Sequence, residues 1–492
     1  MGGGITQLVL KGQMDSYINL NPCINYYKYV YNKHVNFSME NKTVIPDINS
    51  SINLAFTTEN TLVTFSIKRY GDLLSNMYLS FNLPDIFSTD THRFRWVNNV
   101  GHNFIKSATI RVEGSIIDEI YGEWMNIWNE LTNKDGVEYN QLIGNIPEYI
   151  NPNNNNTRYV IKNNIIYNKV YPTAYKTNID NPSIKGRIIQ VPLNFWFTRN
   201  PSLALPLYKI QNQEIKVDVN INDIEKLYQV WCDTLKLYVS PKFYNIIFKD
   251  TININTFIRS DSYIQCFLDI NYIFLDSVYR QNSLRNEGIV KYVVDYVKRQ
   301  TYPVLNITSY GDNYTLTSSY NHIKEIIWVL RRTDIPDKFN IHDNYTASHK
   351  YNETMGILES AQIKWADTII REDQKAYYYN NIQPYQYHTN VPRTGIYCYS
   401  FSLFPEKIVS AGSFNNQMIT TSLYVNINNR GNNDGRKDIT TKNEFKYLFE
   451  LMRRKSVPYI TENEVKLEVI VYTRVINVFS VINGTCNFIW SR

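Results

Sequence analysis

Alternation of apolar and polar residues with a period of two dominates the chain. In VKLEVIVYTRV, at residues 465–475, Val469 and Val471 fall on one face, whereas Tyr472 and Arg474 fall on the other. This spacing predicts a β-strand that is buried on one face only. Similar strands are predicted for EIKVDVNI, TTSLYVNIN and ATIRVEGSII. The pattern as a whole predicts a mainly β-protein.

Two segments follow a helical period instead. GEWMNIWNELTNK places Trp124, Ile127, Trp128 and Leu131 at positions i, i+3, i+4 and i+7, and KNEFKYLFELMRRK, at 442–455, repeats this spacing. Both are predicted to be short surface helices that pack on sheets. Because aromatic residues at helical spacing usually belong to a core, we expect the tryptophan pair to be buried and not to form a ligand platform.

A weak internal repeat occurs at an offset of 206 residues, where LNFWF and VDVNIN recur as YSFSLF and LYVNIN. The aligned pairs are Phe195 with Phe401, Phe197 with Leu403, Val219 with Val425, and Ile221 with Ile427. Chance similarity in an Asn- and Ile-rich chain is the alternative. A duplicated β-domain of about 200 residues agrees with the size that all-β domains commonly reach.

The domain organisation follows from this repeat. We expect an N-terminal arm at 1–26, a first sandwich at 27–222, a linker at 223–233 and a second sandwich with long surface loops at 234–492. Long polar stretches predict the exposed loops. They lie at 151–158, 306–321, 343–356 and 428–438.

Composition excludes several classes of protein. The formal charge of +6, from 51 Lys and Arg against 45 Asp and Glu over 492 residues, is too small for a dominant nucleic-acid footprint. No apolar run is long enough to span a membrane, and no secretory signal is recognisable, so we expect a soluble protein made inside the cell. The five cysteines predict neither a disulfide framework nor a zinc site, and a reducing compartment is expected.

Few residues of the chain form a recognisable catalytic or metal-binding motif. The common phosphate, dinucleotide, zinc and nucleophile motifs are absent. His342, Asp343 and His349 in HDNYTASH are the strongest candidates for a metal site, but their spacing on a predicted loop fixes no geometry, so an exposed polar loop is the preferred interpretation. We therefore expect no catalytic residue, no cofactor and no bound metal.

Two kinds of modification are candidates. Gly2, with Thr6 at the appropriate distance, fits the N-myristoylation pattern, and a loose glycine arm is the alternative interpretation of MGGGIT. Asn313, Asn344 and Asn352 begin N-x-S/T sequons in predicted loops and are candidate glycosylation sites.

Several stretches closely resemble the major capsid protein family of nucleocytoplasmic large DNA viruses. The opening GGGITQLVLKGQMDSYINLNPCINYYKYVYNKHVNFSME is similar to the N-terminal signature of that family. The stretches that follow it keep the order of the family. They are RYGDLLSNMYLSFNLP, the region around GEWMNIWNELT, VPLNFWFTRNPSLALPL, NYIFLDSVYRQ, YSFSLFPEKIVSAGSFN and VYTRVINVFSVINGTCNFIW. The resemblance therefore runs through almost the whole chain.

This resemblance implies two eight-stranded antiparallel jelly rolls per chain and a homotrimer with a pseudo-sixfold outline, which tiles an icosahedral shell. It also implies neighbouring capsomers and minor capsid and penton proteins as partners, with an inner viral membrane near the N-terminal arm and no direct contact with nucleic acid. The protein is then expected in the virion, after assembly in the cytoplasm of the infected host cell. Segments 306–321 and 343–356 are candidates for an exposed tower.

The sequence is also compatible with two other functions. The ending TCNFIWSR departs from the glycine-rich, apolar ending common in the family, and YYYNNIQPYQYHTNVPRTG matches no family pattern. A minor capsid paralogue of the same fold is therefore one alternative. A β-sandwich protein that binds carbohydrate or hydrolyses glycosides is the other, and it predicts a cleft with aromatic platforms and paired carboxylates.

Overall fold

The computed structural model describes Val9, residues 34–47 and 53–54, and most of residues 61–489. Within that last range, the longer segments outside the description are 153–157, 170–181, 304–311, 317–321 and 428–466. The expected N-terminal arm with Gly2, the helix expected at 442–455, and Asn352 lie outside the described residues.

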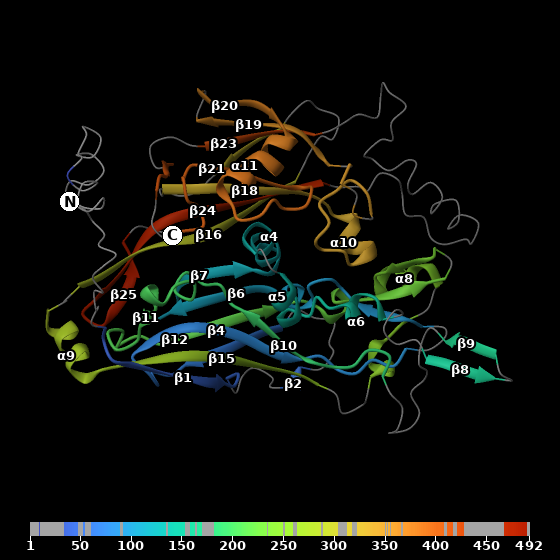
Figure 1. Cartoon of the computed structure of the whole chain (residues 1–492), viewed down its shortest axis with the longest axis horizontal. Coiled ribbons are helices and arrows are strands. Elements are labelled where there is room, and N and C mark those ends of the chain that lie inside the picture. Colours follow the sequence, from blue (N-terminus) through green and yellow to red (C-terminus); the bar gives the residue numbers. More distant parts are fainter. Residues whose placement is uncertain are drawn as a thin grey trace.

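Two sheets form the first sandwich, which we call roll 1 (Figure 1). One sheet has the order β1 (Phe37–Val44), β15 (Ile264–Leu275), β4 (Leu73–Asn82) and β10 (Ile188–Pro192), with β2 (Asn53–Leu54) and β11 (Leu205–Pro206) at its margins. The other has the order β3 (Thr61–Ile67), β12 (Ile215–Ile221), β6 (Ile105–Val112) and β7 (Ser115–Tyr121).

The second sandwich, roll 2, repeats this arrangement. Its first sheet has the order β16 (Ile289–Pro303), β24 (Leu467–Ile482), β18 (His322–Arg332) and β21 (Ile396–Ser400), with β22 (Phe414–Asn415) and β25 (Thr485–Phe488) at its margins. Its second sheet has the order β17 (Asp312–Leu316), β23 (Thr421–Ile427), β19 (Leu358–Trp365) and β20 (Thr368–Lys375). When the main strands of each roll are numbered along the chain, both rolls read 1-8-3-6 and 2-7-4-5.

This strand order is that of a jelly roll, and its occurrence twice confirms the predicted fold class. The repeat at an offset of 206 residues joins equivalent places, because Val219 in β12 and Val425 in β23 lie on the seventh strand of their rolls. One part of the repeat differs in its environment: Phe197 is buried, whereas its counterpart Leu403 is exposed.

The predicted linker at 223–233 was wrong. β15, which is the eighth strand of roll 1, pairs with both β1 and β4. Roll 1 therefore extends to Leu275, and the helix α9 (Ser277–Asn286) leads into roll 2. The repeat located the seventh strands, but a long insertion separates the seventh strand of roll 1 from the eighth, so the boundary was placed one strand too early.

Insertions in the strand connections carry most of the remaining elements. In roll 1 they form a small sheet of β5 (Phe94–Trp96), β13 (Tyr228–Cys232) and β14 (Leu237–Val239), and the hairpin of β8 (Arg158–Lys162) and β9 (Ile165–Lys169). The helices are α3 (Val100–Phe104), α4 (Gly122–Thr132), α5 (Gly136–Leu142), α6 (Pro147–Ile150), η1 (Pro201–Leu203), η2 (Ile224–Lys226), α8 (Pro241–Phe248), η3 (Ile254–Phe257), α10 (Asp334–Phe339), η4 (Tyr378–Ile382) and α11 (Gln383–Tyr387). In Figure 1, α8 and the β8–β9 hairpin lie at the right end of the molecule, α10 lies between α4 and α8, and α9 lies at the left end.

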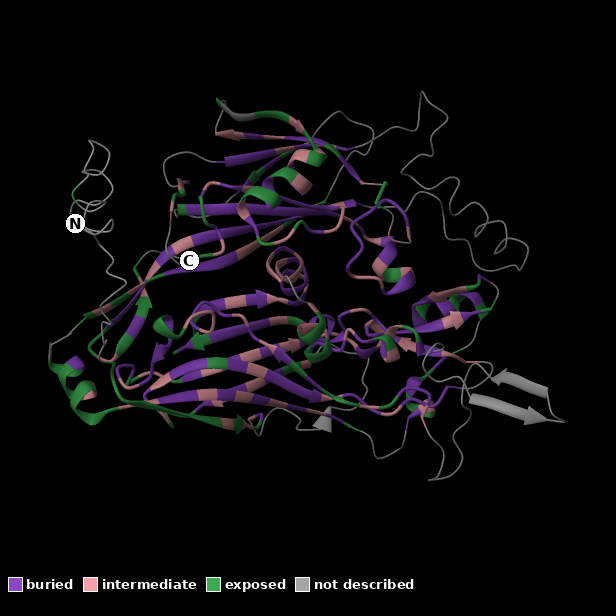
Figure 2. Ribbon diagram, viewed as in Figure 1, coloured by how far each residue is buried: buried purple, intermediate pink, exposed green. Residues whose placement is uncertain are grey.

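The strands were predicted well, with two differences. β12 alternates between buried and partly exposed residues along its whole length, as expected. ATIRVEGSII is two strands and not one, because Glu113 and Gly114 both have positive φ and form the tight turn between β6 and β7. β24, predicted to be buried on one face, is buried on both faces along most of its length (Figure 2).

Among the described residues, no helix combines the length and the apolar character that crossing a membrane requires.

Candidate functional site at the seam between the two rolls

Helix α4 lies between the two rolls and explains the second buried face of β24 (Figure 1). It begins at Gly122, directly after β7, where a Cβ would lie 2.2 Å from the carbonyl oxygens of His102 and Ile105, so only glycine fits. Met125 belongs to the core of roll 1. The opposite side of α4 packs on the outer face of the first sheet of roll 2. That cluster comprises Trp124, Ile127, Leu131, Val297, Ile327, Val329, Tyr345, Ile396, Cys398, Ile470 and Tyr472.

One carboxylate anchors α4 to roll 2. Glu123 accepts hydrogen bonds from the hydroxyl of Tyr472 (2.9 Å) and from Nη1 of Arg331 (3.1 Å), and longer ones of 3.4 Å from Arg299 and Tyr345. Burial and the nearby carboxylate raise the pKa of both phenols well above the ordinary value, so these hydroxyls remain donors. A single acidic side chain of roll 1 thus pairs with four donors of roll 2.

A second ionic cluster is centred on Asp295 of β16. Arg199 of roll 1 (2.9 Å) and Lys324 (3.4 Å) contact this carboxylate, and Arg474 binds it as well. Burial alone would raise the pKa of Asp295, but the positive charges of Arg474, Arg199 and Lys324 outweigh burial and hold it well below the usual range. Asp295 therefore stays ionised and joins the rolls through Arg199.

The same cluster extends to His388. Arg474 donates to Glu325 (2.7 Å), and the imidazole of His388 lies 3.1 Å from Glu325 and 3.2 Å from Glu406. Burial opposes ionisation of both partners, yet the Glu325 carboxylate raises the pKa of His388 to about 12, and Arg474 and His388 lower the pKa of Glu325 to about 2. These groups form a buried network of fixed charges.

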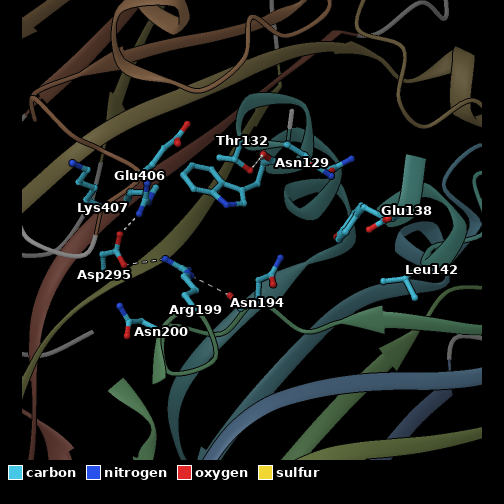
Figure 3. A pocket seen from close by; sticks show the side chains of 14 residues that line it. Asn129, Thr132, Glu138, Leu142, Asn194, Arg199, Asn200, Asp295, Glu406 and Lys407 are labelled. Carbon is cyan, nitrogen blue, oxygen red and sulfur yellow. Dashed lines mark hydrogen bonds and ion pairs between the residues drawn. The ribbon is translucent and has the colours of Figure 1, made fainter. Parts of the chain in front are cut away.

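A pocket of about 920 Å³ opens at the seam beside this network (Figure 3). Trp128, Asp295 and Glu406 contribute to its wall, which resembles the cleft expected of a carbohydrate-active protein. However, the Trp128 ring is stacked on Trp124, and the Arg474 guanidinium lies 4.4 Å from its centroid. Asp295 and Glu406 both have lowered pKa values, whereas the acid of a glycosidase needs a raised one. The pocket does not have the properties of a hydrolase site.

The HDNYTASH loop belongs to the seam and is not the exposed loop that was predicted. Asp343 is buried and accepts hydrogen bonds from Asn98 and Arg393, and Arg393 also pairs with Glu130 of α4. The Nε2 atom of His342 lies 3.1 Å from the carbonyl oxygen of Lys226. No cluster of three or more metal-ligating side chains occurs in the described part of the chain. The first half of segment 343–356 is therefore interior, and only the remainder is left as a tower candidate.

The candidate glycosylation sites differ in their surroundings. Asn313 is exposed on β17. Asn344 is buried, where its amide donates to the carbonyl of Ser348 and its oxygen accepts from Thr346. A glycan on Asn344 would require this turn to open, so the geometry argues against modification of the folded chain.

The far ends of β16 and β24 make a third contact with roll 1. Phe479 and Tyr292 pack against Trp196, and Phe479 and Val481 join the core of roll 1. The amide of Cys486 in β25 donates to the side chain of Gln213. The seam therefore combines two apolar contacts, one at α4 and one at Trp196, with charged clusters at Glu123 and Asp295.

The ionic pairs of the seam could not be found from sequence, because their partners lie far apart along the chain. Glu123 and Tyr472, for example, are 349 positions apart. One signal was present: Tyr472 and Arg474 interrupt an otherwise apolar strand on the face that was predicted to meet solvent. A strand whose polar residues are buried in ionic pairs shows the same alternation as a strand whose polar residues meet solvent.

Comparison with known proteins matches both halves of the chain to one family. Residues 25–276 match the N-terminal region of major capsid proteins, and residues 286–486 match the large eukaryotic DNA virus major capsid protein. The two matches are separated by α9. The chain is 24% identical to probable capsid protein 4 of Acanthamoeba polyphaga mimivirus, over 82% of this chain and 88% of that protein. It is 25% identical to the major capsid protein of Phaeocystis pouchetii virus, over 84% and 91% of the two chains.

Solved structures have the same fold. The chain superposes on the capsid protein in a quasi-atomic model of the PBCV-1 virus capsid with a TM-score of 0.66 and 18% identity, over 95% of this chain and all of that one. The Faustovirus major capsid protein gives a TM-score of 0.62 at 13% identity, over 95% and 94% of the two chains. Two family matches that together cover almost the whole chain, and a jelly roll that occurs twice, lead to one conclusion: the chain belongs to the major capsid protein family of large eukaryotic DNA viruses, and it is a structural protein of the capsid.

Proposed function

We propose that three copies of this chain form a capsomer with a pseudo-hexagonal outline, and that such capsomers tile the faces of an icosahedral shell. The function of the chain is then to supply shape and contact surface, without catalysis.

The observation that carries this proposal is the pair of topologically identical rolls joined by a buried ionic seam. Because each chain presents two similar lobes in a fixed relative orientation, three chains present six. A ring of six similar lobes packs with neighbours as a hexagon does, while the molecule itself needs only threefold symmetry. The charged clusters at Glu123 and Asp295 keep the two lobes of one chain from rotating against each other.

The remaining partners follow from a position in such a shell. Neighbouring capsomers would contact the rim of each trimer, and minor capsid and penton proteins would contact it where the lattice changes direction. The N-terminal arm would lie on the inner side, near the viral membrane. We place the protein in the virion and its assembly in the cytoplasm of the host cell.

Sedimentation equilibrium of the purified chain tests the trimer. We expect a species of three times the chain mass at micromolar concentration, because the interfaces of obligate assemblies usually bury more than about 2,000 Å² in total. A stable monomer under these conditions would contradict the proposal.

A second candidate is a minor capsid paralogue at special lattice positions. It is favoured by the presence of two differently named mimivirus proteins among the relatives, probable capsid protein 4 and capsid protein 1. Quantitative mass spectrometry of purified particles distinguishes the two, since the paralogue would be present in far fewer copies than the main shell protein.

A further inference from the structure

Roll 2 carries a counterpart of helix α4. In roll 1, α4 begins at the first residue after the fifth strand, β7. In roll 2, a helical segment at 376–387, which includes η4 and α11, begins at the first residue after the fifth strand, β20. Both helices therefore occupy the connection between the fifth and sixth strands.

The two helices are attached to their own rolls in the same way. Met125 and Asn126 are the fourth and fifth residues of α4, and both are buried against roll 1, where Asn126 contacts His102 (2.7 Å). The fourth and fifth residues of 376–387 are Tyr379 and Asn380, which are also buried. Asn380 donates to the carbonyl of Ile396 in roll 2. These matched contacts set the same face of each helix toward its own roll.

The opposite faces differ: that of α4 is covered by roll 2, whereas that of 376–387 is partly exposed among the described residues. The third, seventh and tenth residues of α4 are Trp124, Trp128 and Leu131, which face roll 2. At the seventh and tenth positions of the counterpart, Ile382 and Tyr385 are exposed, and Tyr385 is 80% accessible. At the third position of the counterpart, Tyr378 packs partly on the core of roll 2 itself, so it is the later part of this face, at Ile382 and Tyr385, that is left exposed among the described residues.

The turn after the sixth strand repeats this difference. In roll 1, this turn contacts β16 and β24 of roll 2, through Trp196 on Phe479 and through Arg199 on Asp295. In roll 2, the same turn exposes Leu403 and Phe404, and Leu403 is 64% accessible. Leu403 is the residue that the 206-residue repeat aligns with the buried Phe197.

The surface that would receive these groups exists on roll 1. Its strands β1, β15, β4 and β10 are equivalent to β16, β24, β18 and β21, whose outer face α4 covers. On roll 1 that outer face exposes Phe37 and Met39 of β1 and Ile188 of β10, with Met39 60% and Ile188 70% accessible. The other side of this sheet faces the core of roll 1, as Ile189 and Val191 show.

We propose that helix 376–387 and the Leu403–Phe404 turn of one copy dock on the outer face of the β1–β15–β4–β10 sheet of a second copy. The contact repeats between chains the one that α4 and the Arg199 turn make within a chain. A head-to-tail contact of this kind closes into a ring when its rotation permits, and three copies then alternate roll 1 and roll 2 around six positions. This inference rests on the proposed trimer and specifies its interface.

Charge substitution at exposed positions tests it with the full chain. Leu403→Asp disrupts the surface that docks, and Met39→Asp disrupts the sheet face that receives it, because burial of an unpaired carboxylate is unfavourable. The matched control is Val278→Asp on α9, where Val278 is 61% accessible and lies outside both surfaces. We expect the dissociation constant of the trimer to be at least tenfold higher for each of the first two variants than for the wild type. The control should remain a trimer. Circular dichroism should show unchanged folding in all three.

Mixing the two variants sharpens the test. Because each variant keeps the surface that the other has lost, an equimolar mixture should form a dimer with one intact interface. As a second measurement, Phe404→Cys and Met39→Cys in one chain should be joined between copies by a short bis-maleimide.

If the wild type is a trimer but both charge variants also remain trimers, or if the double-cysteine variant gives no cross-link between copies, this interface is overturned and the proposed trimer stands. A monomeric wild type would contradict the proposed trimer, and the interface with it.

Discussion

At the scale of single residues, the seam depends on a few ionised groups that have several partners each. Glu123 joins two arginines and two tyrosines, and Asp295 joins two arginines and a lysine. Buried charges of this kind add little net stability when complete, but removal of one partner leaves others uncompensated. We expect them to act mainly by specifying one orientation of the two rolls.

Substitution of Glu123 tests this role. Glu123→Gln should lower the stability of the folded chain by about 3 kcal/mol, because it leaves Arg299 and Arg331 with one fewer counter-charge at a largely buried position. The readout is the denaturant midpoint of unfolding. The matched control is Glu359→Gln on β19, where Glu359 is exposed, and it should stay within about 0.5 kcal/mol of the wild type. Equal effects of the two substitutions would contradict an anchoring role.

The His388 cluster predicts a pH dependence. Glu325 has a lowered pKa in the folded chain, so its contribution is present above the ordinary value of 4.5 and is lost as the pH falls toward 2. His388 has a raised pKa, so its contribution is complete below the ordinary value of 6.5 and is lost as the pH rises toward 12. Both contributions are complete between pH 4.5 and 6.5.

The measurement is the difference in unfolding free energy between the wild type and His388→Gln across pH 6 to 9. Above pH 6.5 we expect this difference to shrink by up to about 1.4 kcal/mol per pH unit, since one proton is released on unfolding. A difference that stays constant over this range would show that His388 does not carry the charge assigned to it.

At the scale of elements, sequence patterns predicted what depends on neighbouring residues. α4 lies where the i, i+3, i+4 spacing placed it, and β12 and β23 alternate as expected. What depends on distant contacts was not predictable: the second buried face of β24 forms through contact with α4 and, near its far end, with roll 1 residues such as Trp196. The early domain boundary has the same origin, because β15 joins roll 1 by pairing with β4, which lies far back along the chain.

The seam also predicts how the chain behaves when α9 is cut. A site for a sequence-specific protease inserted after Arg285, which is exposed at the end of α9, should be cleaved in the native protein. We expect the two fragments to elute together in gel filtration and to separate only in denaturant, because the contacts of α4 and β24 do not depend on the tether. Separation of the fragments under native conditions would mean that α9, and not the seam, holds the rolls together.

At the scale of the whole molecule, one asymmetry links the seam to assembly. The outer face of the first sheet is covered by α4 on roll 2 and is exposed at Phe37, Met39 and Ile188 on roll 1. The helix after the fifth strand of roll 1, α4, packs on roll 2, whereas its counterpart at 376–387 exposes Ile382 and Tyr385. A chain with one used and one unused copy of the same contact can extend by adding further copies of itself. The fold alone does not reveal this property, because it appears only when equivalent residues of the two rolls are compared.

Electron cryo-microscopy of the purified full-length chain tests the central claim most directly. The account predicts a closed ring of three copies with six lobes, in which the contact between chains reproduces the contact between rolls within a chain. Particles with a single copy, or rings in which neighbouring chains meet through other faces, would contradict it.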